Sequence, residues 1–323
     1  MINAKYYADM QGLSKQFMHQ YSINIPEQFP HLPRVIVCGM WGSTLYVPLV
    51  QDLLAHHQIA VHLEACSSYT LPPFDVANTV VVCASHSGNT EETLACLDSA
   101  LVQKAKLVVF ASWWALLTQA QEKHMPLYQI PAGLQPRLST GYFIVALLDL
   151  LAHLWYPVHV IQSAIVEAAK QLVASDESDT KLLAQVLLTA TPIIYTCDVL
   201  KSMSTICKIK CNENSKTPAF AHYIPELNHN EMCGRLGHTM TPHFIIFTSH
   251  FTHPRNLRRI AVMTDLLQKE GYLVTIIAPK GDSLEAEALW IYQYMDYVTY
   301  FLAEAKGVDP ETVPIVETFK ALL

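Results

Sequence analysis

Residues 80–94, VVVCASHSGNTEETL, join an apolar β-branched run to a hydroxyl-rich turn and then to the start of a helix. The valines predict a buried strand. Gly88 permits a tight turn, and Asn89, three residues before Glu92, fits a helix start. The turn therefore holds hydroxyl groups and backbone N–H groups at the positive end of a helix dipole, which suits phosphate or another small anion. An ordinary capped strand-to-helix turn is equally compatible with these residues alone.

Outward from this stretch, short apolar strands alternate with helical segments. A long apolar helix is expected from Gly141 to about Leu154. Such alternation implies a parallel sheet covered by helices on its faces. The expected strands of this half are 34–39, 59–66, 79–84, 107–112 and 126–133.

The second half of the chain repeats the order of the first. TPIIYTCD can be set against PRVIVCGM, HFIIFTSH against TVVVCASH, and VTIIAP against LVVFAS. This duplication predicts an α/β fold of two similar flavodoxin-like subdomains, each a mostly parallel sheet covered by helices. SHFTHPRN stands where the first half has its SGNT turn, so one anion site is expected, in the first half.

These patterns predict three segments. Residues 1–155 form an N-terminal domain with a leading helix and the phosphate-binding turns, and 156–190 form a helical bridge. Residues 191–323 form a C-terminal domain with an acid/base loop and a C-terminal helix.

Composition narrows the class of protein. Of the 323 residues, 51% are hydrophobic and 15% charged, which favours buried sheets and large apolar interfaces over disorder. No apolar run approaches the ~18 residues of a membrane span, and the N-terminus lacks a signal-peptide core. The net charge of −7, without a dense Lys/Arg block, argues against nucleic acid as a partner. We expect a cytoplasmic protein with no membrane partner.

The eight cysteines show no disulfide-like spacing, which fits reduced, buried thiols. One alternative is a zinc site made by Cys207, Cys211, His229 and Cys233, although this spacing matches no standard zinc finger. The expectation is that the chain binds no metal.

Three constellations can carry chemistry. The turn GMWGS (39–43) follows a strand next to the one that precedes SHSGNT, so Ser43 is expected to join Ser85, Ser87 and Thr90 at one sheet edge. Neither turn gives the G-x-G-x-x-G pattern of dinucleotide sites. Arg137 lies between a proline and an apolar helix, where it either enters a cleft or stays on the surface.

The third constellation is the polar stretch 210–235, which we interpret as a loop. It is dense in acid/base groups and is therefore an active-site candidate, with a solvated surface loop as the alternative. Its acid/base residues are Glu213, His222, Glu226, His229 and Glu231.

These motifs resemble the bifunctional phosphoglucose/phosphomannose isomerases, which are built from two sugar isomerase (SIS) domains. The resemblance covers nearly the whole chain and rests on the glycine-serine turn, SGNTEET, QPR followed by GY, NEN, NHNE and the terminal GVDP…ETFK. It implies a homodimeric aldose–ketose isomerase that needs no cofactor. The expected substrate is glucose 6-phosphate, with mannose 6-phosphate as an additional candidate, each interconverted with fructose 6-phosphate.

The resemblance also implies roles for individual residues. The phosphate is held by the two turns, through Gly42, Ser43, Ser85, Ser87 and Thr90. Arg137 stabilises the enediolate, and Glu213 is the base that moves a proton between C1 and C2. His229 opens the sugar ring from the neighbouring subunit. Thr299 and Lys306 match more loosely a threonine linked to mannose 6-phosphate and a lysine near the ring oxygen.

Two positions depart from the family pattern. Trp41 stands in GMWGS where the family usually has glycine, which can narrow the pocket, change the sugar or point into a subunit contact. His86 replaces a common tyrosine and is interpreted as a packed imidazole. Two other functions therefore stay open: a non-catalytic sugar-phosphate sensor, and an isomerase of another keto- or amino-sugar phosphate.

Overall fold

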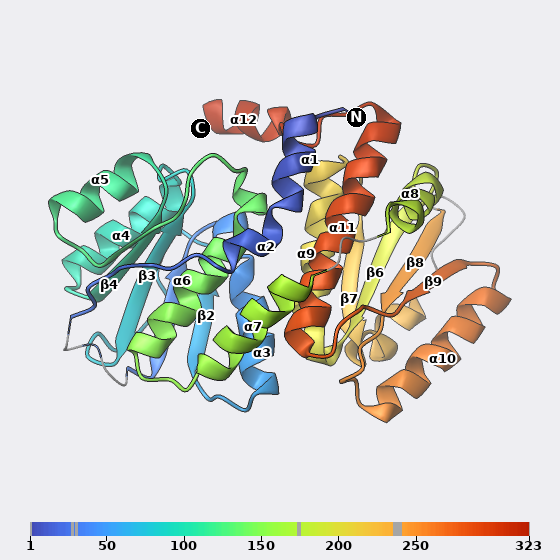
Figure 1. The fold of residues 1–323 in the computed structure, drawn as a ribbon, viewed down its shortest axis with the longest axis horizontal. Coiled ribbons are helices and arrows are strands. Elements are labelled where there is room, and N and C mark those ends of the chain that lie inside the picture. The colour runs from blue at the N-terminus through green and yellow to red at the C-terminus, as the bar shows by residue number, and fades with distance from the viewer. Residues whose placement is uncertain (1, 27–28, 30–31, 173–175, 235–240, 323) are drawn as a thin grey trace. The chain divides into compact units, whose positions relative to one another are not determined.

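The structure is a computed structural model that describes residues 2–26, 29, 32–172, 176–234 and 241–322. The chain divides into two compact units (Figure 1). One comprises Gly12–Lys170, and the other comprises Met1–Gln11 together with Gln171–Leu323. The first eleven residues, including helix α1 (Ala4–Gln11), therefore group with the second half of the chain. Residues 173–175 of the expected helical bridge and Arg235 of the polar stretch lie outside the described residues.

The unit Gly12–Lys170 is built on a five-stranded sheet in which every neighbouring pair is parallel. The strand order is β2-β1-β3-β4-β5, which is the flavodoxin-like order. The middle strand β3 is buried along its whole length, as its valines predict. The strands are β1 (Arg34–Cys38), β2 (His62–Cys66), β3 (Thr79–Ser85), β4 (Lys106–Ala111) and β5 (Leu127–Gln129).

Helices cover this sheet, as alternation in the sequence predicts. Helix α4 packs on β1, β3 and β4, while α3 packs on β2 and against α6. The helices are α2 (Leu13–Gln16), α3 (Tyr46–His56), α4 (Glu91–Val102), α5 (Trp114–Glu122), α6 (Thr140–His153) and α7 (His159–Gln171), with the 3-10 turns η1 (Trp41–Ser43) and η2 (Pro136–Leu138).

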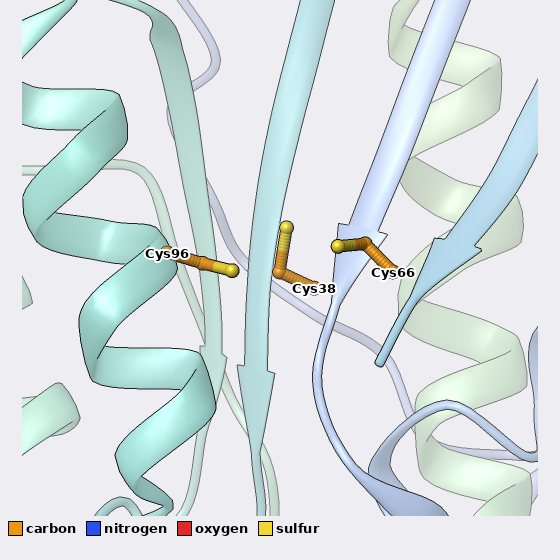
Figure 2. A group of neighbouring side chains, drawn as sticks. All are labelled: Cys38, Cys66 and Cys96. Carbon is orange, nitrogen blue, oxygen red and sulfur yellow. The ribbon is translucent and has the colours of Figure 1, made fainter. Parts of the chain in front are cut away.

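Three thiols of this unit point toward one another in its core (Figure 2). Cys38 and Cys66 are the last residues of β1 and β2 and pair in register, and Cys96 comes from α4. Hydrogen bonds from the thiols of Cys38, chiefly, and Cys96 lower the pKa of the Cys66 thiol, against the effect of its burial. All eight cysteines are free, as expected.

The zinc alternative finds no support in the described residues. Cys207 and Cys211 are completely buried, whereas Cys233 is exposed. Together with His229 they form no group of metal-ligand spacing among the residues described.

The second unit repeats the topology with four parallel strands in the order β7-β6-β8-β9. Relative to chain order this is the arrangement of the first four strands of the other sheet, which confirms the predicted pair of similar parallel α/β subdomains. The strands are β6 (Thr191–Cys197), β7 (Phe220–Ile224), β8 (Pro242–Phe247) and β9 (Leu273–Ile277).

Helix α9 packs on β6 and β7, and α11 packs on α8 and α9 (Figure 1). Helix α11 is 23 residues long and largely buried, so it contributes much of the core of this unit. The remaining elements are α8 (Glu177–Val186), η3 (Asp198–Leu200), α9 (Lys201–Asn214), η4 (Glu226–His229), η5 (Glu231–Cys233), α10 (Pro254–Lys269), α11 (Leu284–Lys306) and α12 (Pro314–Ala321).

The interpretation of 210–235 as one loop is wrong. Its first residues are the end of α9, and Phe220–Ile224 form β7. Among the described strands, this one lies at the sheet edge and pairs with β6 alone. Because one side of an edge strand is not covered by another strand, its sequence lacks the continuous apolar run of a central parallel strand.

Among the described helices, none has the length and apolar character that crossing a membrane requires.

Candidate functional site

The GMWGS turn follows β1 and begins with Gly39 packed against the backbone of β3. A Cβ at Gly39 would lie 2.4 Å from the Ala84 carbonyl oxygen. Trp41 has φ of +55°, a left-handed conformation that favours glycine and costs about 1–2 kcal/mol for other residues. Ser43, the last residue of η1, is buried and accepts a hydrogen bond at Oγ from the His86 backbone N–H at 3.0 Å. The two predicted turns are therefore joined directly.

The SHSGNT turn gathers its hydroxyl groups at the end of β3. Ser85 Oγ lies 2.9 Å from Thr90 Oγ1 and 3.4 Å from Ser87 Oγ. Ser85 Oγ also accepts the Gly88 backbone N–H at 2.9 Å. The structure thus brings together the four predicted phosphate-binding hydroxyls of Ser43, Ser85, Ser87 and Thr90.

Helix α4 starts directly at these hydroxyls. Its N-cap residue is Thr90, and the Thr90 side chain makes no capping hydrogen bond within the described part of the chain. Asn89, expected as the cap, instead accepts the Ala115 backbone N–H at Oδ1 at 3.2 Å. Since the first N–H groups of a helix have no partners inside the helix, they are available to an anion held by the hydroxyls.

Gly88 is the residue that makes this turn possible. Its φ is +77°, and a Cβ would lie only 1.7 Å from the Trp113 carbonyl oxygen. Leu116 N–H donates to the Gly88 carbonyl at 3.0 Å, which fixes the turn against the start of α5.

Gly88→Ala is expected to abolish phosphate-dependent stabilisation because the added methyl group displaces the turn from the Trp113 carbonyl. The measurement is the shift in melting temperature on adding inorganic phosphate. Gly133→Ala is the matched control: its φ is also positive, at +97°, but an added Cβ would meet no atom of the described residues within 4 Å. An unchanged phosphate response in Gly88→Ala would contradict this role of the turn.

His86 lies in the same turn as a packed imidazole, which agrees with the sequence interpretation. The side chain is 6% exposed and packs 6.5 Å from the Phe143 ring centroid. Burial lowers its pKa to about 4. The ring is therefore neutral near pH 7 and adds no positive charge to the anion site.

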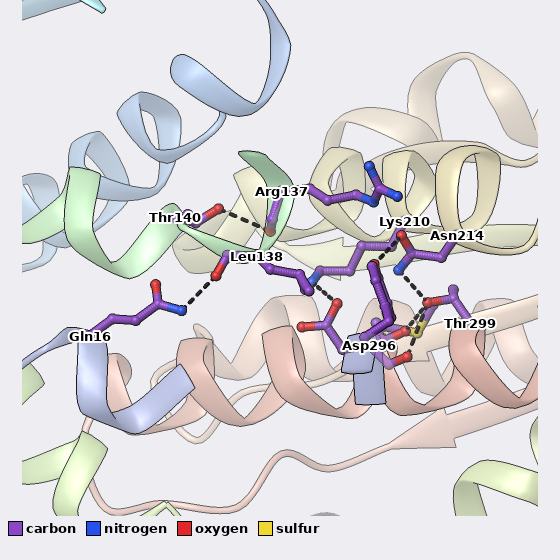
Figure 3. A network of polar contacts seen from close by, with 10 residues as sticks. Gln16, Arg137, Leu138, Thr140, Lys210, Asn214, Asp296 and Thr299 are labelled. Atoms are coloured by element: carbon purple, nitrogen blue, oxygen red, sulfur yellow. Dashed lines mark hydrogen bonds and ion pairs between the residues drawn. The ribbon is translucent and has the colours of Figure 1, made fainter. Parts of the chain in front are cut away.

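The QPR turn lies beside the glycine-serine turn of the same unit. A Cβ at Gly42 would lie 3.2 Å from the Pro136 carbonyl carbon and 3.4 Å from the Arg137 nitrogen. The segment that follows the QPR turn is fixed by Gln16, which is 1% exposed. Gln16 Nε2 donates to the Leu138 carbonyl (Figure 3), and Gln16 Oε1 accepts the Gly141 N–H at 2.9 Å. Arg137 itself is buried, so the surface-arginine alternative is wrong.

The corresponding edge of the other sheet has different chemistry. After β8, the His250 backbone N–H and Nδ1 both contact Glu287 Oε1, at 2.9 and 2.6 Å. The Glu287 side chain is completely buried. The edge after β8 therefore places a buried carboxyl group where the first unit has its hydroxyl-rich turn, and the single phosphate site expected in the first half stays a prediction.

Glu213 lies near the C-terminus of α9 and is partly exposed. Lys216, just beyond the helix, donates from Nζ to the carbonyl oxygens of Glu213 and Asp309, each at 2.6 Å. The lysine thus donates a hydrogen bond to a carbonyl oxygen at the end of the helix. Its positive charge there also interacts favourably with the negative end of the helix dipole. This arrangement fixes the backbone that carries the Glu213 carboxylate.

The next residue, Asn214, is completely buried and joins α1 and α11 to the end of α9. Its Nδ2 donates to Thr299 Oγ1 at 2.9 Å, and its Oδ1 accepts the Tyr6 hydroxyl at 2.8 Å (Figure 3). Thr299 is also fully buried, and its hydroxyl donates to the Met295 carbonyl at 2.6 Å. Thr299 therefore contacts the helix that carries Glu213.

One turn earlier on α9, Lys210 forms an ion pair with Asp296 of α11 (Figure 3). Both side chains are at most 3% exposed, and Lys210 Nζ lies 3.3 Å from the Tyr292 ring centroid. The sequence interpretation did not identify this pair. The four-residue spacing of Lys210 and Asn214 places both on one face of α9, and that spacing is the signal that was available.

Lys306 is the last residue of α11, and its side chain contacts the segment that follows α9. Its Nζ donates to the Lys216 carbonyl at 3.1 Å and to Thr217 Oγ1 at 2.9 Å. Burial lowers the pKa of its ammonium group. Glu213, Thr299 and Lys306 therefore all belong to the region where α11 contacts the end of α9.

His229 lies apart from that region, at the end of η4 after β7, and is exposed. Its exposure in a single chain leaves the imidazole accessible to another molecule. The neighbouring Asn228 side chain contacts the sulfur atoms of Met232 and Met263.

Comparison with known proteins places this chain in a family. Residues 176–323 match the family model "Bacterial phospho-glucose isomerase C-terminal SIS domain". The chain is 28% identical to a bifunctional phosphoglucose/phosphomannose isomerase of Aquifex aeolicus, covering 97% of both chains, and 30% identical to the one of Thermoplasma acidophilum, covering 88% of both. Its fold is similar to a solved hypothetical protein of Thermus thermophilus, with a TM-score of 0.68 and 17% identity, over 98% of this chain and 87% of the other. The resemblance inferred from the motifs is confirmed: the chain belongs to the family of bifunctional phosphoglucose/phosphomannose isomerases.

Proposed function

We propose that this chain is an aldose–ketose isomerase that interconverts glucose 6-phosphate, and also mannose 6-phosphate, with fructose 6-phosphate. The observation that carries the proposal is the gathering of four hydroxyl groups and an uncapped helix start beside the Arg137 turn. Together with family membership, it supports a site for a small phosphorylated substrate.

In this proposal the phosphate is bound by Ser43, Ser85, Ser87 and Thr90, with Gly42 allowing the Arg137 turn to approach. Phosphate contacts lie away from the reacting carbons and supply binding energy that positions the sugar. Since the overall charge of the chain is −7, this local group of donors must attract the anion against the general field.

The proposed chemistry begins when His229 opens the sugar ring by moving a proton from the anomeric hydroxyl to the ring oxygen. Glu213 then removes the proton from C2 of the aldose and gives it to C1, through a cis-enediol, while a second proton moves from O2 to O1. Arg137 stabilises the negative charge that develops on the oxygens during this transfer. None of these steps requires a metal or an organic cofactor.

Lys306 and Thr299 have different roles in the proposed site: one acts near the substrate and the other acts through neighbouring residues. Lys306 acts near the ring oxygen, and its lowered pKa favours the release of a proton more than that of an ordinary lysine does. Thr299 is buried, so we propose that it influences the use of mannose 6-phosphate through Asn214 and the position of Glu213.

We also propose a cytoplasmic homodimer in which His229 enters the site of the neighbouring subunit. The exposure of His229 in one chain supports this arrangement.

The test of the function is a coupled assay of the purified protein against hexose, pentose and amino-hexose phosphates. Turnover of glucose 6-phosphate and mannose 6-phosphate above the others is the expected result. Turnover of only a different keto- or amino-sugar phosphate would replace the substrate. Binding without any turnover would favour a sugar-phosphate sensor.

Trp41→Gly is expected to raise kcat/KM for glucose 6-phosphate relative to the smaller pentose phosphates, because it removes a large side chain beside the proposed phosphate-binding turn. It also relieves the positive φ of this position. The measurement is the ratio of the two kcat/KM values. Trp155→Gly is the matched control, since Trp155 also has a positive φ, at +68°, but lies on the surface after α6. An equal ratio in the two variants would show that Trp41 does not limit the substrate.

A further inference from the structure

The three thiols of Cys38, Cys66 and Cys96 form the one group of metal-ligand spacing found among the described residues. Their Sγ atoms all lie within 4.8 Å of one another (Figure 2). The residues come from two strand ends and a helix, so the tertiary fold creates the group. The interpretation of the sequence did not identify it, because the spacings of 28 and 30 residues match no metal-binding motif.

The sulfur atoms lie close enough together for all three to bind one ion. Three points within 4.8 Å of one another share a centre no farther than 4.8/√3, about 2.8 Å, from any of them. Metal–thiolate bonds are about 2.3 Å long. Small side-chain rotations, without a change in backbone, therefore bring all three sulfur atoms to bonding distance.

The surroundings of the group restrict which ion fits. Cys38 and Cys96 are fully buried and Cys66 is 8% exposed, within a mainly aliphatic core that also contains the thiol of Cys83. The described residues offer no fourth His, Cys, Asp or Glu ligand at this position. Structural zinc sites are four-coordinate, whereas soft thiolates with a lower coordination number suit copper(I).

The group also lies close to an exposed segment of the chain, to which two of its thiols donate hydrogen bonds. The Cys66 thiol donates to the Thr70 carbonyl at 3.5 Å, and the Cys96 thiol donates to the Ser68 carbonyl at 3.2 Å. Residues 67–70 are exposed. An ion can therefore reach the thiols by local movement of this segment, without opening the sheet.

We propose that Cys38, Cys66 and Cys96 bind a soft monovalent cation, copper(I), as a three-coordinate site. Binding forms three copper–sulfur bonds and releases the displaced thiol protons to solvent, with no change of oxidation state. This site is separate from the proposed isomerase chemistry and does not depend on it.

The site lies next to the GMWGS turn of the same unit, which is one of the turns proposed to bind phosphate. Gly39 follows Cys38, and its N–H donates to the Cys66 carbonyl at 3.1 Å. Ser67 Oγ donates to the Gly39 carbonyl at 2.9 Å. The ion thus joins β1, β2 and α4, and the free energy by which it stabilises the unit rises with the logarithm of the free ion concentration above Kd.

The test is a titration of the full chain with copper(I), without oxygen and against the chelator bicinchoninate. A Cys233→Ser background removes the exposed thiol. One equivalent is expected to bind, to raise the melting temperature and to give an X-ray absorption spectrum with three sulfur neighbours. Cys96→Ser in this background is expected to lose that equivalent. Cys83→Ser, which changes a fully buried cysteine outside the group, should keep it.

Each variant is first compared for far-UV circular dichroism and melting temperature without the ion. If Cys96→Ser does not fold, Cys66→Ser, at the least buried of the three positions, takes its place. The proposal would be overturned if no copper binds, or if the Cys96→Ser or Cys66→Ser variant binds as much copper as the Cys233→Ser background. It would also be overturned if two thiols of the group lose their hydrogens and form a disulfide.

Discussion

Glu213→Gln is expected to lower kcat by roughly 10²–10⁴-fold, the usual contribution of a general base. Glutamine keeps the size of the side chain but cannot accept the C2 proton. The turns proposed to bind phosphate belong to the other unit and are unchanged, so stabilisation by glucose 6-phosphate in thermal melts should persist. Glu213→Ala should likewise lose turnover and keep the substrate-dependent stabilisation.

The matched control is Glu226→Gln, which changes an exposed carboxylate of the same polar stretch that contacts Asn230 at 3.3 Å. Its kcat should be close to that of the unmodified protein. If Glu213→Gln turns over substrate at a near-normal rate, or if Glu226→Gln is the inactive variant, the assignment of the base is wrong.

Lys210→Met is expected to lower the free energy of unfolding by about 3–5 kcal/mol, the usual cost of leaving one member of a buried ion pair without its partner. Asp296 would then be a buried carboxylate without the Lys210 ammonium group as its ion-pair partner. Since Lys210 and Asn214 hold α9 against α11, kcat should fall as well. Urea unfolding followed by circular dichroism gives the free energy.

Two further variants separate the buried pair from ordinary surface charge. Lys269→Met breaks an exposed pair with Asp265 and should cost at most about 1 kcal/mol. The double variant Lys210→Met/Asp296→Leu replaces both charges by apolar groups and should recover much of the stability. Equal losses for Lys210→Met and Lys269→Met would contradict the structural role of the buried pair.

The sequence predicts the sheets well because central parallel strands are buried on both faces. Their continuous apolar runs, such as Val80–Val82, distinguish them from neighbouring segments, and the turns after them hold small and hydroxyl residues. The cluster of hydroxyl groups proposed to bind phosphate could be predicted for the same reason. Parallel topology brings the ends of adjacent strands to one edge, as the Ser43–His86 hydrogen bond illustrates.

Features that depend on contacts between distant segments could not be predicted. Edge strand β7 lacks a clear pattern, so the stretch around it was interpreted as a loop. The Lys210–Asp296 pair joins residues 86 positions apart, and Thr299 gives no sequence signal of its hydrogen bond to Asn214. The thiol group needs the register of β1 with β2 and the packing of α4, neither of which composition or spacing specifies.

The most direct test of the proposed isomerase is proton NMR of glucose 6-phosphate incubated with the protein in D2O. The proposal predicts that fructose 6-phosphate appears and that deuterium enters C2 of the aldose, because the proton held by Glu213 exchanges with solvent between the two carbons. Glu213→Gln should show neither change. Absence of fructose 6-phosphate with the unmodified protein, or deuterium exchange at an undiminished rate in Glu213→Gln, would contradict it.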